Sequence, residues 1–132
     1  MVRLSLKTAR RCEFIDITVK VEEAVRSSGV TEGVALVYCP HTTAAVTINE
    51  NADPSVTADI TMKSSKLVDH DDPEYRHMEG NSDGHVKSSL FGASEAVIID
   101  GGSLVLGTWQ GIYFAEFDGP RSRTVLVKVI EG

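Results

Sequence analysis

The sequence is poor in several features that would place it in a specialised class of protein. Only two of its 132 residues are cysteines, and aromatic residues make up 6%. Two cysteines, Cys12 and Cys39, are too few for a disulfide-stapled scaffold, and no charged-then-apolar leader opens the chain. We therefore expect reduced thiols and a cytoplasmic protein, although the residues leave a single bridge open. Eleven Gly and four Pro are ordinary usage, which excludes a collagen-like or disordered chain.

Long apolar runs and an excess of basic residues are also missing. The longest stretches without a formal charge, Gly33 to Asn49 and Gly101 to Ala115, are shorter than the ~20 apolar residues of a membrane helix. The net charge of −6 and the lack of a basic stripe disfavour nucleic acid as a partner. Glycine fingerprints for phosphate loops or dinucleotides are absent, and no serine stands in an elbow pattern. No membrane or nucleic-acid partner is expected.

The negative charge is concentrated in one segment. Glu50 to His85 holds nine acids and three bases, a net −6, whereas the remaining residues hold ten of each. The same segment carries three of the four histidines: His70, His77 and His85. Such a segment suits a bound cation, and the alternative is a solvated acidic face.

The hydrophobic pattern predicts one α+β domain over residues 1–132. Alternation from Val2 to Leu6 indicates a half-buried strand. A helix is expected over 19–28, capped by Thr18 and ended by Gly29. Asp53 and Pro54 start a second helix over 54–68 with Val56, Ile60 and Leu67 on one face. A short third helix should follow 81–83, and the remaining strands are expected at 34–39, 44–48, 96–99, 104–106, 112–117 and 124–130.

The last strand is apolar on both faces, because Val125, Val127 and Val129 alternate with Leu126 and Ile130. A strand of this kind is covered on both sides, either by another layer or by another subunit.

Histidine and hydroxyl residues mark the first candidate site. His41, Thr42 and Thr43 follow a buried strand, where sheet proteins commonly display functional groups. His77 and His85 flank a turn-forming sequence that can bring them together. The three imidazoles are either ligands of zinc or a related ion, or polar loop residues bonded to carbonyls and carboxylates.

Other polar residues have two interpretations each. Asp83, Glu79 or Glu50 can orient an imidazole, whereas Asp83 can also cap a turn. Trp109 can cover a ligand ring or pack in a core or interface, and Gln110 beside it is equally ambiguous.

Two arginines form the last candidate group. Arg121 and Arg123 stand two apart and either hold a phosphate or pair with Glu116 and Asp118 in an exposed cluster. If they bind an anion, Arg121→Ala should weaken that binding and leave folding nearly untouched.

Four motifs together resemble one family over essentially the whole chain: His41 to Ala44 with Ile48 to Glu50, Glu79 to His85, Leu106 to Ile112, and Glu116 to Arg121. The chain resembles the YjbQ-like family, also called the secondary thiamine-phosphate synthase family. Where that family commonly has Asn-Ala-Asp-Ala-His, this chain has Asn81-Ser82-Asp83-Gly84-His85.

The resemblance implies an α+β fold with a β-sandwich core of about seven mostly antiparallel strands and two or three helices, assembled as a homotrimer. It also implies a divalent metal, zinc or another transition metal, held by His41, His77 and His85, with His70 standing apart. The implied activity is a weak synthase reaction that joins a pyrimidine diphosphate to a thiazole phosphate and releases diphosphate. We assign catalytic roles to Glu50, Asp83 and Gln110, and binding of a small phosphorylated metabolite to Thr42, Thr43, Asn49, Trp109, Arg121 and Arg123.

A metal site made of imidazoles is unusual for a diphosphate substrate. Proteins normally bind diphosphates together with magnesium, which is held by carboxylates and water molecules. Magnesium is therefore a second metal to consider. Whether the chain is an enzyme stays open at this point. The alternatives are a metal-assisted hydrolase of a small phosphorylated or carbonyl compound, and a non-catalytic metal-holding protein.

Overall fold

The structure, a computed structural model that describes residues 1–132, contains eight strands and three helices. This is the α+β class expected from the sequence, with one more strand than the pattern indicated. In chain order the elements are β1 (Val2–Lys7), β2 (Glu13–Asp16), α1 (Thr18–Ser28), β3 (Gly33–Tyr38), β4 (Ala44–Glu50), α2 (Pro54–Leu67), α3 (Ser82–Phe91), β5 (Ser94–Asp100), β6 (Ser103–Leu104), β7 (Gln110–Glu116) and β8 (Ser122–Glu131).

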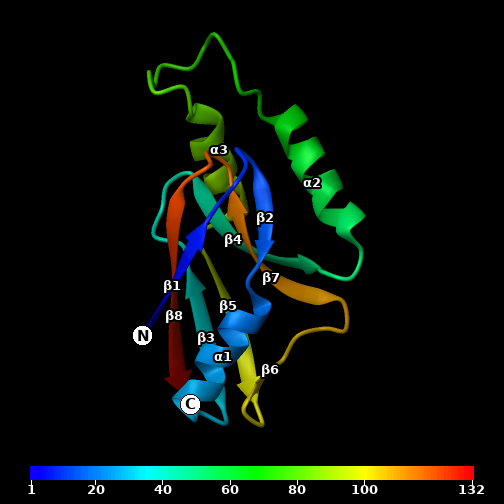
Figure 1. The fold of residues 1–132 in the computed structure, drawn as a ribbon, viewed down its shortest axis with the longest axis vertical. Coiled ribbons are helices and arrows are strands. Elements are labelled where there is room, and N and C mark those ends of the chain that lie inside the picture. Colours follow the sequence, from blue (N-terminus) through cyan, green and yellow to red (C-terminus); the bar gives the residue numbers. More distant parts are fainter.

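The strands form two sheets, and every neighbouring pair is antiparallel. The larger sheet has the order β1-β8-β3-β5-β6, and the smaller has the order β2-β7-β4. Both sheets contribute to the main hydrophobic cluster, which includes Val37 and Val127 from the larger sheet and Val46 and Phe114 from the smaller. The core thus lies between the sheets, with α1 at one end and α3 at the other (Figure 1).

The helix boundaries confirm two of the predicted signals and correct one. Gly29 closes α1 with φ 70°, a left-handed conformation that glycine adopts without strain. The Asp53 side chain accepts a hydrogen bond of 2.9 Å from the Ser55 N–H and caps α2. Thr18 is not the cap of α1, since its hydroxyl donates to Asp16 and accepts the Ile112 N–H. That hydroxyl joins the helix to β7 instead.

Helix α2 packs differently from the prediction. Ser64 is its only buried residue, and Leu67, expected on the buried face, is 74% exposed. The helix lies beside the two sheets rather than across either (Figure 1). Its apolar periodicity therefore does not mark a face of the core.

The outer face of the larger sheet is apolar and uncovered in the single chain. On β8, Val125 and Val127 are buried, but Leu126 is half-buried and Ile130 is exposed. Across the sheet, Tyr38 and Ile98 are exposed in the same layer. The second apolar face of the last strand has no covering layer within the chain.

Two smaller expectations can also be compared with the structure. The hairpin at residues 100–103 forms, but β6 spans only Ser103–Leu104 rather than 104–106. Cys12 and Cys39 are both free. None of the three helices is long and apolar enough to cross a membrane.

Candidate functional site

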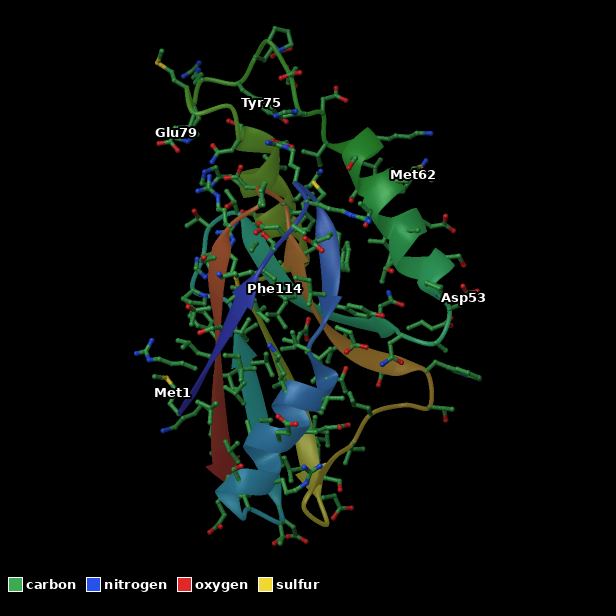
Figure 2. The ribbon with its side chains drawn as sticks, viewed as in Figure 1. Met1, Asp53, Met62, Tyr75, Glu79 and Phe114 are labelled. Atoms are coloured by element: carbon green, nitrogen blue, oxygen red, sulfur yellow. The ribbon has the colours of Figure 1, made fainter.

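A polar surface pocket of about 340 Å³ gathers half of the predicted site residues. It lies at the end of the sheets next to α3, near Glu79 in Figure 2. Apart from Pro40, all its lining residues are polar or charged. Its lining comes from the loop after β3, the start of α3 and the turn before β8, and comprises Pro40, His41, Thr42, Thr43, Glu79, Asn81, His85, Asp118, Arg121 and Arg123.

A buried ion pair forms the base of this site. Glu116 is 0% exposed, and its carboxylate accepts hydrogen bonds from both Nε and Nη2 of Arg123. The same carboxylate accepts the Thr8 hydroxyl and the backbone N–H groups of Phe117 and Asp118. The expected pairing of these residues therefore exists, but it is buried rather than exposed. Replacing Arg123 is therefore expected to lower the stability of the fold.

The Arg123 guanidinium also fixes the loop that carries His41. Its Nη2 donates to the Thr43 hydroxyl at 2.8 Å. Thr43 is buried, and its carbonyl oxygen accepts the Phe117 N–H. Thr43 therefore positions the loop, whereas Thr42 beside it is exposed and free to meet a ligand.

A second carboxylate, Asp118, organises the opposite wall. It accepts hydrogen bonds from Arg121 Nη2 at 3.0 Å and from Asn81 Nδ2 at 2.8 Å. Burial opposes its ionisation, but the Asn81 hydrogen bond and the charges of Arg121 and Arg11 lower the pKa of Asp118 below its usual value. The carboxylate is thus ionised at neutral pH.

The Asn81 side chain has one unsatisfied atom. Its Oδ1 is buried and has no hydrogen-bond partner in the chain. A buried carbonyl oxygen without a partner is costly, so a ligand that presents an N–H or O–H donor would relieve it. Asn81 was expected only to cap α3, where its side chain makes no capping bond.

His41 is held as a neutral ring in this structure. Its Nε2 accepts the Thr124 N–H at 2.9 Å, so the ring proton lies on Nδ1. Burial and the neighbouring Arg123 charge lower the pKa of His41. At neutral pH this residue can therefore donate through Nδ1–H, while its Nε2 lone pair is occupied.

The other histidines only partly meet the expected arrangement. The rings of His77 and His85 pack edge to face with centroids 5.2 Å apart, and His85 lines the same pocket as His41. His70 stands outside the pocket, with Nε2 3.1 Å from the Gly80 carbonyl oxygen. No three His, Cys, Asp or Glu side chains are grouped so that they could hold a metal ion. In this arrangement His41 Nε2 accepts the Thr124 N–H and is not available to a metal ion.

Four predicted site residues lie away from the pocket. Asn49 and Glu50 are at the far end of β4 from Ala44, about 20 Å along the strand at the usual rise per residue. Gln110 pairs with Glu50 across the sheet, and its side chain accepts the Gly107 N–H. Trp109 is 62% exposed in the same region, so it is not a core residue. Within one chain these residues do not reach the polar pocket.

Asp83 has a role that neither interpretation anticipated. It is buried in the first turn of α3 and accepts a hydrogen bond of 2.9 Å from Arg11 Nη2. Arg11 also lies 3.9 Å from Asp118, so it connects both carboxylates. Asp83 therefore anchors α3 to the segment before β2 and orients no imidazole.

The fold and pocket define a class of small α+β proteins in which two antiparallel sheets carry a polar pocket at one end. The chain matches the family described as "UPF0047 protein YjbQ-like" over residues 2–132. It belongs to this family, as its motifs indicated.

Its relatives cover almost the whole chain. UPF0047 protein YugU of Bacillus subtilis is 54% identical over 127 residues, 96% of each chain. UPF0047 protein MJ1081 of Methanocaldococcus jannaschii is 52% identical over 130 residues, which are 98% of this chain and 94% of that protein.

Solved structures of the family agree with the fold. A YjbQ/UPF0047 family protein from Clostridium acetobutylicum superimposes with a TM-score of 0.97 at 56% identity, covering 98% of this chain and all of that one. A protein described as YbjQ-like and of unknown function, from Sulfolobus solfataricus, gives a TM-score of 0.95 at 32% identity, covering 99% and 96%.

Proposed function

We propose that the polar pocket binds a small phosphorylated metabolite and catalyses a transfer in which diphosphate leaves. The observation that carries this proposal is the set of unused donors on the two pocket arginines. Arg121 and Arg123 each use Nε and Nη2 for bonds within the chain, and their Nη1 groups make none. A guanidinium has five N–H donors, so each retains two that can meet an anion.

The state of His41 favours transfer over base-catalysed hydrolysis. A general base needs a free nitrogen lone pair, and His41 Nε2 already accepts the Thr124 N–H. Its Nδ1–H can instead donate to a departing phosphate oxygen. A neutral thiazole nitrogen that attacks a pyrimidine methylene needs little base catalysis and much stabilisation of the leaving diphosphate. The pocket groups match that demand.

The specific reaction we propose is the weak thiamine-phosphate synthase activity implied by the family resemblance. In it a pyrimidine diphosphate and a thiazole phosphate are joined, and diphosphate is released. The unpartnered Oδ1 of Asn81 would accept a donor of the bound substrate. Metal binding, whether of a transition metal or of magnesium, stays a prediction, and no step of this proposal uses a metal ion.

We also propose that the protein forms a homotrimer. The support is the exposed apolar face of the larger sheet, where Tyr38, Ile98 and Ile130 lie in one layer. Faces of this kind commonly mark protein interfaces.

The test of the pocket is diphosphate binding by titration calorimetry, combined with an assay for the joined product. Arg121→Ala should weaken binding roughly 10-fold, since a hydrogen bond to a charged group contributes about 1.5–3 kcal/mol. Arg121 is half exposed, so folding should survive the change. Arg26→Ala, which removes one arginine from α1 at the opposite end of the molecule, is the matched control (Figure 1). Equal diphosphate affinity in the wild type and Arg121→Ala would show that the anion does not bind in this pocket.

A further inference from the structure

We infer that Cys12 is a selective modification site for small electrophiles, activated by the buried ammonium group of Lys87. Both side chains lie outside the polar pocket: Cys12 lines the groove between β2 and α2, and Lys87 reaches its sulfur from α3. Lys87 Nζ is 3.8 Å from Cys12 Sγ and 3.3 Å from Ser65 Oγ. The inference does not depend on the proposed function.

Lys87 is a buried cation without a counter-ion. Its residue is only 2% exposed, and it takes part in none of the ion pairs of the chain. The Phe117 ring also lies near, with its centroid 5.7 Å from Nζ. Buried charges are normally paired with an opposite charge, and the fold places no negative charge beside this ammonium group.

The sulfur of Cys12 is the atom best placed to supply that charge. Glu13 lines the same groove, but its carboxylate accepts the backbone N–H groups of Ala9 and Arg10. The Ser65 hydroxyl is neutral at any ordinary pH. Thiols attack as thiolates, and a Cys12 thiolate would form an ion pair with the uncompensated Lys87 ammonium 3.8 Å away, which favours the reactive form.

The groove gives small molecules access to this sulfur. It has a volume of about 640 Å³, and both Cys12 and Ser65 contribute to its lining. Cys12 is half-buried rather than enclosed. Met62, labelled in Figure 2, comes from the α2 side of the groove. A compact electrophile fits such a volume, whereas a folded protein does not.

The chain contains its own comparison thiol. Cys39 is 1% exposed, and its sulfur contacts the backbone carbonyl of His41 at 4.0 Å. Burial raises the pKa of the Cys39 thiol. No ammonium group contacts it, so it should react slowly in the folded protein.

The experiment uses iodoacetamide as the probe electrophile on the folded full-length protein. The Cys12 sulfur attacks the methylene carbon, a C–S bond forms, the C–I bond breaks, iodide leaves, and the thiol proton passes to solvent. Trypsin cleaves on both sides of Cys12–Lys20 and leaves Cys39 in a separate peptide, so mass spectrometry follows each thiol independently. We expect Cys12 to react at least ~10-fold faster than Cys39.

The Lys87→Met variant tests the cause. Methionine keeps a long apolar side chain but removes the charge, and Cys12 should then react ~10-fold more slowly. Lys63→Met, which removes an exposed lysine from α2, should leave the rate unchanged. The Cys39 rate reports folding, because a loosened fold would expose that thiol as well.

Three results would overturn the inference. They are equal rates at Cys12 and Cys39 in the wild type, a Cys12 rate in Lys87→Met within twofold of the wild type, and the same loss of rate in Lys63→Met. If Lys87→Met raises the Cys39 rate, Lys87→Gln provides the second comparison, and unchanged Cys12 reactivity there would equally refute the role of the charge.

Discussion

The buried pair of Glu116 and Arg123 should be the most sensitive element of the site to a charge change. Replacing Glu116 with glutamine keeps the size and shape of the side chain but removes its negative charge. In the native chain the two carboxylate oxygens accept five hydrogen bonds, from Thr8, Phe117, Asp118 and twice from Arg123. An amide NH2 group in place of either oxygen puts donors against donors at two or more of these contacts.

The expected cost follows from this geometry. Each buried donor left without an acceptor costs about 1–3 kcal/mol, and removing one member of a buried ion pair costs about 3–5 kcal/mol in all. A domain of this kind has a free energy of unfolding of about 5–15 kcal/mol, so Glu116→Gln should lose roughly a fifth of it or more.

Urea unfolding followed by far-ultraviolet circular dichroism, at one fixed protein concentration, measures this loss. Trp109 is too exposed for its fluorescence to report on the core. Adding Arg123→Met to Glu116→Gln should recover part of the stability, because the uncompensated cation is then gone. Glu131→Gln at the exposed end of β8 is the control and should change stability by less than about 0.5 kcal/mol. A loss below about 1 kcal/mol in Glu116→Gln would show that the pair is not the tight buried contact described above.

Two further predictions follow from the same structure. The pKa of Asp118 is lowered in the folded state, so the ionised carboxylate stabilises the fold at neutral pH, and this stabilisation is lost as pH falls through the lowered pKa, below about pH 4. In acid unfolding curves the difference in stability between the wild type and Asp118→Asn should therefore become smaller in that range. A difference that stays constant with pH would contradict this prediction. Ile98→Asp places a charge on the exposed apolar sheet face, and light scattering at micromolar concentration should show a trimer for the wild type and smaller species for the variant, whereas a monomeric wild type would exclude the assembly.

Local signals in the sequence predicted most of the elements. Gly29 ends α1 and Asp53 begins α2 because each satisfies backbone groups within a few residues, which is information that a short window contains. The position of α2 was not predictable in the same way. Its apolar residues suggested a buried face, but burial depends on which partner the helix meets, and Ser64 is the only α2 residue that is buried within the chain.

The sequence predicted which residues line the candidate site better than it predicted the contacts that those residues make. His41, His85, Arg121 and Arg123 were chosen from the sequence and do line one pocket. Glu50 and Gln110 lie away from that pocket within one chain, because β4 carries its two ends to opposite ends of the smaller sheet, a separation that motif spacing cannot show. The three-imidazole centre stays a prediction, and the contact that motif spacing could not show is the hydrogen bond from the Thr124 N–H to His41.

The residues that the sequence did not identify explain how the pocket handles charge. Asp118 pairs with Arg121, and Glu116 pairs with Arg123, so both cations are already neutralised before any ligand arrives. An incoming diphosphate gains the free Nη1 donors but also meets the ionised Asp118 carboxylate, which repels it. The binding free energy of a diphosphate at this pocket is therefore the difference between an attractive and a repulsive contribution. A pocket with both arginine donors and an ionised Asp118 favours a ligand that brings hydrogen-bond donors of its own to Asn81 and Asp118. It would hold a bare anion only weakly. That expectation agrees with the weak synthase activity proposed here and not with a tight diphosphate-binding enzyme.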